Sequence, residues 1–173
     1  MFSFKQLQAE QIPWVKHNFP DRPAWMPLMG MFEEYGEFLD ASRSGSEEEI
    51  SDAIADITIF LADFCTSQDL DLEKLWELRK SKYNNDFLGE GDLGIILGKL
   101  AHHYLKSYQN IRGGKDEHRL KIESNICKLL EFLDYMVWNE YNSDDNFINL
   151  IEKTWNKVKK RDFRKNSIDG ISK

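Results

Sequence analysis

Acidic side chains gather in one part of the sequence without basic neighbours. Nine aspartates and glutamates lie between Arg43 and Lys74, and that interval contains no lysine or arginine. Four of the nine follow one stripe of a predicted helix, at i, i+3, i+7 and i+14: Glu49, Asp52, Asp56 and Asp63. An apolar stripe follows another side of that helix: Ile50, Ile54, Ile57, Leu61 and Phe64.

These carboxylates predict a cation site. Like charges one helical turn apart repel each other, and the cost grows when the side chains are partly buried. A face that is only solvated would normally contain lysine or arginine between the acids, and a solvated face is the alternative interpretation. A hard divalent cation held by carboxylate oxygens would relieve the repulsion. Three acids on the preceding predicted helix extend the candidate set: Glu33, Glu34 and Glu37.

Two predicted helices, joined by a loop over residues 42–46, must hold these acids together. Pro27 suits the first turn of the first helix. Ser46 followed three residues later by Glu49 matches a capping box, so the second helix is expected to begin there. We therefore expect a helical hairpin over residues 28–64.

The rest of the chain is also predicted to be helical. No segment alternates between apolar and polar residues for long enough to predict a strand. Proline and glycine mark breaks at 17–23, 84–92 and 110–114. Further helices are expected at 3–17, 71–83, 93–109, 115–139 and 143–161, with a frayed tail after Lys165. The pattern predicts an all-α helical bundle.

Size and composition set limits on the class of protein. The 173 residues are 41% hydrophobic, enough for a sizeable core, and 31% charged, which favours a soluble chain. No apolar run approaches the roughly 20 residues of a membrane span, and the N-terminus has no signal-peptide pattern. Cys65 and Cys127 fall in apolar helical patterns, which indicates free thiols. We expect a cytoplasmic protein that does not bind membranes.

Charge is distributed unevenly along the chain. Residues 1–88 contain 8 Lys and Arg against 17 Asp and Glu, whereas residues 89–173 contain 15 against 13. The overall net charge of −7 argues against duplex nucleic acid as a partner. The basic second half could supply cations that the acidic first half lacks.

The second half repeats the first in outline, which indicates a duplicated helical unit. Residues 36–38 align with 98–100, and residues 54–57 align with 126–129. In this alignment Glu37 corresponds to Lys99, and Asp56 corresponds to Lys128. We predict a repeat with an acidic metal site over 1–88, a degenerate repeat over 89–165 and a tail over 166–173. A chance match of helical periods is the alternative.

Three stretches of the chain resemble the MazG-like all-α nucleoside triphosphate pyrophosphohydrolases. They are Trp14 with Asn18-Phe19-Pro20, the run from Pro27 to Glu37, and the run from Asp52 to Leu61. The family signature has Glu-x-x-Glu on one helix and Glu-x-x-Asp on the next, and Glu34 and Glu37 fit the first pair. The resemblance extends over most of residues 14–163 and implies a MazG-like helical bundle of two tandem repeats.

The second pair of the signature fits in two registers. Aligned on Ile-Ala-Asp-Ile, the glutamate of the family falls on Ala53, with Asp52 just before it and Asp56 at the aspartate position. A literal Glu-x-x-Asp exists one turn earlier, from Glu49 to Asp52. The apolar residues after Asp56 favour the first register. The implied metal ligands are therefore Glu34, Glu37, Asp52 and Asp56, with Glu33 and Glu49 as further candidates.

The resemblance implies Mg²⁺-dependent hydrolysis of a nucleoside or deoxynucleoside triphosphate to a monophosphate and pyrophosphate, with Mn²⁺ as a substitute ion. A triphosphate and an acidic surface repel each other, so a hard cation between them is expected. Glu33 or Glu34 could orient or deprotonate the attacking water. A dUTPase-like specificity lies within the same class.

Other residues are candidates for contacts with the substrate. Phosphate charge that the metal ion does not neutralise would need lysine or arginine. The candidates lie at two predicted helix ends: Lys80, Lys82, Lys157, Lys160 and Arg161. Ordinary complementation of the helix dipole is the alternative for each of them. Trp14 and His17 precede the acidic helices and could contact a base, with core packing as the alternative for Trp14.

Two questions stay open at this level. The chain could act as a monomeric pseudo-dimer of its two repeats or as a homodimer. A non-catalytic nucleotide-binding or assembly module that kept the fold is the rival to an enzyme, because Ala53 and the degenerate repeat depart from the signature.

Overall fold

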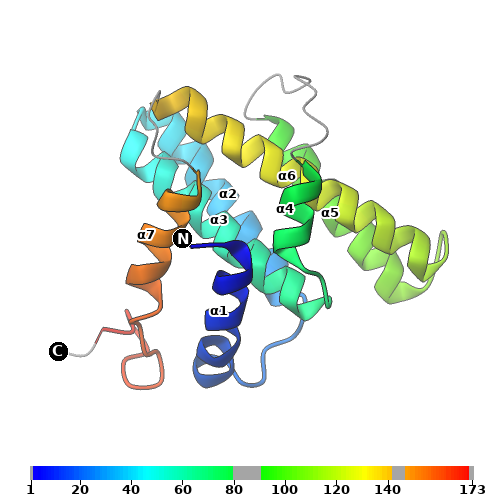
Figure 1. Ribbon diagram of the computed structural model, residues 1–173, viewed down its shortest axis with the longest axis horizontal. Helices are drawn as coiled ribbons and strands as arrows, with labels where there is room; N and C mark the ends of the chain where they lie inside the picture. Colours follow the sequence, from blue (N-terminus) through cyan, green and yellow to red (C-terminus); the bar gives the residue numbers. More distant parts are fainter. Residues whose placement is uncertain (1, 80–90, 142–146, 172–173) are drawn as a thin grey trace.

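The computed structural model describes residues 2–79, 91–141 and 147–171 and, within helix α6, the side chains up to residue 137. The described residues form helices joined by turns and contain no β-strand, which confirms the all-α prediction (Figure 1). The helices are α1 (Phe4–Asn18), α2 (Met26–Ser44), α3 (Glu47–Ser67), α4 (Leu72–Arg79), α5 (Gly91–Gln109), α6 (Lys115–Tyr141) and α7 (Phe147–Val158).

Helices α2 and α3 form the predicted hairpin. Pro27 lies in the first turn of α2, and Ser46 caps α3, its Oγ accepting a hydrogen bond from the Glu49 amide at 3.4 Å. The loop expected over residues 42–46 is wrong in its first part, because α2 continues to Ser44. Gly45, with a φ of 73°, ends the helix by donating its amide to the Ala41 carbonyl at 2.9 Å. A left-handed residue at this position closes the turn without further loop residues.

Helix α3 lies at the centre of the bundle and packs against α1, α2, α6 and α7. The predicted apolar stripe is buried throughout, from Ile50 to Phe64. The stripe that bears Asp52 and Asp56 therefore lies on the remaining, outward side of the helix, with α2 alongside it. This central position fixes the direction of the acidic side chains.

A second hairpin is formed by α5 and α6, which extends away from α2 and α3 (Figure 1). Its turn contains Asn110, Arg112 and Gly113 at positive φ. The hairpin joins the rest of the molecule through contacts of α5 with α2 and of α6 with α3 and α4. Two helical hairpins in one bundle are the arrangement expected for a duplicated unit, and the duplication itself stays a prediction.

Helix α7 and the segment after it lie beside α1 (Figure 1). Three side chains of α1, one to two turns apart, fasten this contact. Glu10 accepts hydrogen bonds from Trp155 Nε1 at 2.8 Å and Lys159 Nζ at 2.9 Å. Further along α1, Trp14 Nε1 donates to the Arg161 carbonyl at 3.0 Å, and Asn18 Oδ1 accepts from the Phe163 amide at 2.8 Å.

The segment after α7 is folded as far as the structure describes it, so the expectation of a frayed tail is wrong for residues 166–171. Asp162 donates its amide to the Gly170 carbonyl at 2.6 Å, and Gly170 donates its own amide to the Asn166 carbonyl at 3.0 Å. Gly170 has a φ of 69°, and a Cβ there would lie 2.7 Å from Arg161 Cβ. A side chain at this position would push the turn away from Arg161.

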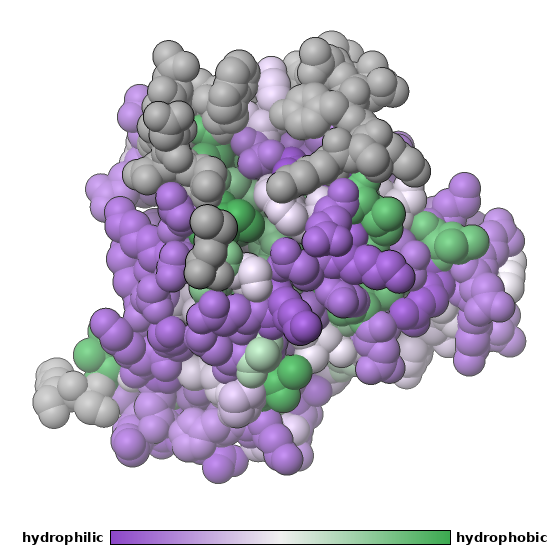
Figure 2. Space-filling view, viewed as in Figure 1, coloured by the Kyte–Doolittle hydropathy of each residue, from purple (hydrophilic) through white to green (hydrophobic). Residues whose placement is uncertain are grey.

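On the face that Figure 2 shows, hydrophobic residues form small separate areas among hydrophilic ones. None of the helices in the described ranges is long and apolar enough to cross a membrane. Cys65 and Cys127 do not form a disulfide, as predicted, and Cys65 is fully buried.

Candidate active site

Five carboxylates from the first hairpin form what we call the acid cluster. Glu33, Glu34 and Glu37 come from α2, and Asp52 and Asp56 come from α3. Glu34 and Asp56 are half-buried, whereas the other three are exposed. The helical spacings place these side chains on adjoining faces of two antiparallel helices.

The acid cluster has a strong mutual repulsion. Burial raises the pKa of Glu34 to about 8, with further contributions from Asp56, Glu37, Glu33 and Asp52 in that order. Burial also raises the pKa of Asp56 to about 6, and Asp52 adds to the effect. Carboxylates that are hard to ionise together are ones that a bound cation would stabilise.

The two registers of the sequence signature have different structural outcomes. Ala53 is only 3% exposed and belongs to the core, so its position on α3 cannot direct a ligand toward the acid cluster. Asp52 and Asp56 both act on the pKa of Glu34. Glu49 is exposed in the first turn of α3, and its amide donates a hydrogen bond to the capping Ser46 Oγ. The arrangement favours the register with Asp52 and Asp56.

Cations reach the acid cluster from the second half of the chain. Arg161 and Lys157 both lower the pKa of Asp56, against the effect of its burial. Arg161 is placed there by the contact of its own carbonyl with Trp14, and Lys157 lies in the last turn of α7. The sequence suggested this contribution from charge asymmetry alone, and the geometry places both residues near the acids.

A cavity of about 620 Å³ opens beside the acid cluster. Glu33, Glu34, Asp56 and Arg161 line it at the position of the cluster. Much of the remaining wall is aromatic and apolar: Trp14, Phe19, Trp25, Met26, Met29, Phe60 and Phe163. We call it the aromatic cavity. Trp14 packs edge-on against Phe19 and Phe163, with ring centroids 5.8 and 6.3 Å away, so it is both a packing residue and a wall of the cavity.

Another cavity, of about 510 Å³, lies between α3 and α7. Asp52 lines it from one side, and Lys153 and Lys157 line it from the other. Asp52 thus belongs to the acid cluster and also shares this cavity with a pair of lysines. Lys153 was missed by the sequence reasoning, although its position one turn before Lys157 on a helix was a usable signal.

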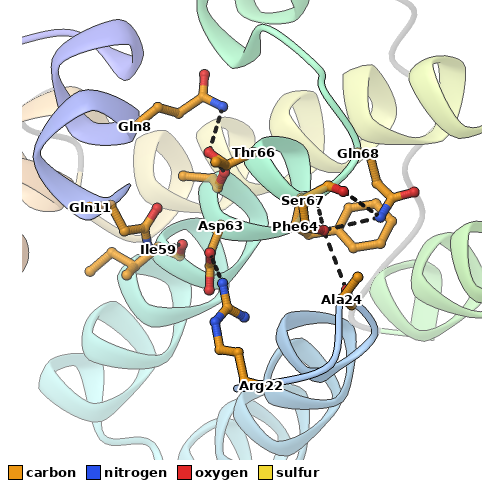
Figure 3. A network of polar contacts seen from close by, with 11 residues as sticks. Gln8, Gln11, Arg22, Ala24, Ile59, Asp63, Phe64, Thr66, Ser67 and Gln68 are labelled. Atoms are coloured by element: carbon orange, nitrogen blue, oxygen red, sulfur yellow. Dashed lines mark hydrogen bonds and ion pairs between the residues drawn. The ribbon is translucent and has the colours of Figure 1, made fainter. Parts of the chain in front are cut away.

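The last acid of the predicted stripe, Asp63, has a different environment. It forms an ion pair with Arg22, which comes from the loop before α2, and the two side chains are 9% and 16% exposed (Figure 3). At this end of the stripe, the positive charge is therefore supplied by Arg22 from outside the acidic interval. The sequence reasoning missed Arg22, because its partner is 41 residues away along the chain.

Two of the remaining candidates, His17 and Lys160, do not join the acid cluster. His17 lies on the surface with its Nε2 3.2 Å from Asp162 Oδ1 and does not line the aromatic cavity. Lys160 is exposed and lines neither of the two cavities near the acids. Lys80 and Lys82 lie outside the described residues.

The donor set of the acid cluster fits a hard divalent cation. All its members offer oxygen atoms, which Mg²⁺ and Mn²⁺ prefer, and burial followed by repulsion from neighbouring acids raises the pKa values of Glu34 and Asp56, which a bound cation would offset. Within the described ranges, no three His, Cys, Asp or Glu side chains already surround a single metal position. Mg²⁺ often keeps several waters and is completed by substrate phosphates, so it does not require a closed protein cage.

Comparison with known proteins gives one match. Residues 3–82 match the family model described as phosphoribosyl-ATP pyrophosphohydrolase. Neither the curated proteins nor the solved structures give a significant match to the chain. The matched region contains α1 to α4, and with them every member of the acid cluster. Residues 3–82 are therefore similar to a nucleotide pyrophosphohydrolase domain of the MazG-like all-α type, which is a hydrolase acting on nucleotide phosphates.

Proposed function

We propose that the protein is a Mg²⁺-dependent nucleoside triphosphate pyrophosphohydrolase that converts a (deoxy)nucleoside triphosphate and water to the monophosphate and pyrophosphate. The observation that carries this proposal is the acid cluster, with Glu34 and Asp56 half-buried, at a cavity of nucleotide size with Arg161 beside it. Ligand cavities usually have volumes of roughly 300–1,000 Å³ and mostly apolar walls with a few polar groups.

Each part of the site has a role in this reaction. Glu34, Glu37, Asp52 and Asp56 would hold Mg²⁺. When bound, the metal ion would neutralise phosphate charge and lower the pKa of bound water. Arg161 and Lys157 bind phosphate oxygens, since they are the cations that act on Asp56.

Proton transfer falls to Glu33 or Glu34, two of the carboxylates that line the cavity. Water forms a new bond to phosphorus while the bond from phosphorus to the oxygen bridging the α- and β-phosphates breaks. The proton of the water passes to the carboxylate, and the bridging oxygen leaves with pyrophosphate. A base with a pKa near the working pH is efficient in such a step.

The direct test is an assay of purified protein for pyrophosphate release from a panel of NTPs and dNTPs with Mg²⁺, Mn²⁺ or EDTA. We expect turnover that EDTA abolishes and that yields equal amounts of monophosphate and pyrophosphate. Release of orthophosphate would contradict the assignment of the broken bond. No turnover by a folded protein across the panel would favour the rival, a non-catalytic nucleotide-binding module.

A second candidate substrate is carried by the family match. The matching family is named for phosphoribosyl-ATP, which also contains a triphosphate that a pyrophosphohydrolase divides. Adding phosphoribosyl-ATP to the panel separates the two candidates by kcat/KM. The oligomeric state of the active species is checked in the same preparation by light scattering, because a pseudo-dimer would be active as a monomer.

A further inference from the structure

The aromatic cavity extends along α3 from the acid cluster to a second polar region. Its lining includes Asp56 at one end and Asp63 seven residues later, a distance of about 10 Å along the helix axis. On α2, which runs in the opposite direction, the lining begins at Met26 and reaches Glu34. A substrate with its phosphates at Asp56 would therefore place its other end near Asp63.

This far end is polar and buried. Gln11 is 3% exposed and Asp63 is 6% exposed, and both line the cavity together with Arg22. Gln11 is held by the Ile59 carbonyl and Arg22 by Asp63, so the two contacts on α3 are one helical turn apart. Figure 3 shows Gln11 on α1, Asp63 on α3 and Arg22 from the intervening loop converging there.

One acceptor at this end has no partner among the described residues. Gln11 Nε2 donates to the Ile59 carbonyl at 2.9 Å, which fixes the orientation of the amide because a carbonyl can accept only from the nitrogen side. Gln11 Oε1 therefore faces away from Ile59, buried and without a hydrogen bond. A buried acceptor left unpaired costs free energy, and a ligand that donates to it recovers that cost.

We propose that this end of the cavity recognises a guanine base, an inference that rests on the proposed nucleotide site. The protein offers two acceptors, Gln11 Oε1 and the Asp63 carboxylate, followed by one donor, the Arg22 guanidinium. Guanine presents the complementary order on one edge: the 2-amino group and N1–H as donors, then O6 as acceptor. The 2-amino group meets Gln11, N1–H meets Asp63, and O6 meets Arg22.

Each of the other common bases would place a hydrogen-bond acceptor opposite one of the two acceptors of the protein, Gln11 Oε1 or the Asp63 carboxylate. Adenine and cytosine have an unprotonated ring nitrogen at the position that would face Asp63. Uracil and thymine have a single N–H between two carbonyl oxygens, so one oxygen would face Gln11. A polar site rejects a base whose groups leave its own buried atoms unpaired more strongly than an apolar wall rejects a change in shape. The aromatic walls contribute affinity that is similar for every base.

The first experiment varies the nucleotide. We expect kcat/KM of the wild-type protein to be about tenfold higher for GTP than for ITP, which lacks only the 2-amino group, and about 100-fold higher than for ATP. Equal values for GTP and ITP, or a preference for any other base, would overturn the proposal. Turnover without base preference would do so while leaving the proposed activity intact.

The second experiment varies the protein. Gln11→Met keeps the side-chain length but removes the acceptor. In this variant, kcat/KM for GTP should fall to that for ITP, while kcat/KM for ITP stays within about threefold of the wild-type value. In Asp63→Asn, GTP and ITP should weaken alike, because both nucleotides carry N1–H. Asp40→Asn is the matched control, because Asp40 is exposed on α2 and its one ion pair among the described residues is with Arg43 at 3.2 Å. An unchanged GTP to ITP ratio in Gln11→Met would overturn the assignment.

A binding measurement separates this proposal from the proposed reaction. Calorimetric titration of the wild-type protein with the α,β-methylene analogues of GTP, ITP and ATP, with Mg²⁺ present, needs no turnover. Tighter binding of the GTP analogue by a protein that hydrolyses no nucleotide would support the guanine site and reject the enzyme. Equal binding of all three analogues would reject the guanine site whether or not the protein is an enzyme.

Discussion

The two helical hairpins of this bundle differ most at the positions that the sequence aligns. In the hairpin of α2 and α3, Glu37 and Asp56 belong to the acid cluster. In the hairpin of α5 and α6, the aligned residues are Lys99 and Lys128, and they line one cavity of about 550 Å³ together with Arg79 of α4. The structure thus brings both aligned pairs together, each within its own hairpin.

The difference in charge balance teaches what the acids are for. The cavity lined by Lys99 and Lys128 also contains Glu123 and Glu131, so opposite charges alternate there. The acid cluster contains no cation from its own hairpin, and burial with mutual repulsion raises the pKa of Glu34 and Asp56. In the predicted alignment, the second hairpin has lysines at these positions, which is the reason to expect that the fold does not need carboxylates there. Such unfavourable placement is typical of functional sites.

The largest effect that would test this comparison is the loss of activity on neutralising the acid cluster. Glu34→Gln and Asp56→Asn remove a charge without changing shape, and we expect each to lower kcat/KM by about 100- to 1,000-fold. Lys99→Ala and Lys128→Ala, at the aligned positions of the second hairpin, should keep kcat/KM within about twofold of the wild-type value. Pyrophosphate release measures the effect, and circular dichroism verifies folding. Equal losses in the two hairpins would break the comparison.

The fold was predictable because local patterns determine it. The buried stripe from Ile50 to Phe64 has a helical period that neighbouring packing does not override, and the Ser46 cap appears in the sequence. The error at residues 42–44 has a local cause as well. Serine next to glycine resembles a loop, but Gly45 alone supplies the left-handed turn.

The candidate site was predictable only in part, because several of its contacts join distant segments. The acids on α2 and α3 follow from helical spacing. The pairing of Arg22 with Asp63 and the unpaired Gln11 Oε1 depend on how α1 packs against α3, and no spacing rule contains that information. Arg161 was suggested by charge asymmetry, but its position depends on Trp14, far away in the sequence.

A second prediction sharpens the contrast within the first hairpin. It concerns Asp63, which forms a buried ion pair with Arg22, in contrast to the members of the acid cluster. Arg22→Met should lower the free energy of unfolding by about 2–3 kcal/mol at pH 8, because it leaves the buried Asp63 carboxylate without its partner. Denaturant unfolding measures the loss. Arg43→Met, whose pair with Asp40 is exposed, should change stability by less than about 1 kcal/mol.

The pH dependence of that loss follows from the pKa of Asp63. Burial raises the pKa of Asp63 from 3.8 to about 6, even though Arg22 lowers it. The contribution of Asp63 to the free energy of unfolding is therefore fully present below about pH 3.8 and is lost as the pH rises through 6. Without Arg22 the pKa of Asp63 rises further, so the free energy of unfolding continues to fall to a higher pH. The difference between wild type and Arg22→Met should therefore be small at pH 5 and complete at pH 8. A difference independent of pH would show that Arg22 acts by packing.

A third prediction tests whether the second half of the chain completes the acidic site. Arg161→Ala and Lys157→Ala should each lower kcat/KM by about tenfold, with the main effect on KM if they bind phosphate in the ground state. Lys160→Ala is the matched control, since Lys160 is adjacent but lines neither cavity beside the acids. If all three variants behave like wild type, the first hairpin works without cations from α7.

The smallest expected effect concerns two glycines of α2. One packs against the Phe60 ring, and the other faces open space. A Cβ on Gly30 would lie 2.5 Å from the Phe60 ring, whereas a Cβ on Gly36 would meet no atom within 4 Å. Gly30→Ala should therefore cost about 1–2 kcal/mol and raise KM, because the displaced Phe60 ring forms part of the aromatic cavity. Gly36→Ala should instead stabilise the helix by about 0.5–1 kcal/mol. Thermal unfolding with nucleotide titration measures both quantities, and a Gly30→Ala variant that loses stability without any change in KM would separate Phe60 from substrate binding.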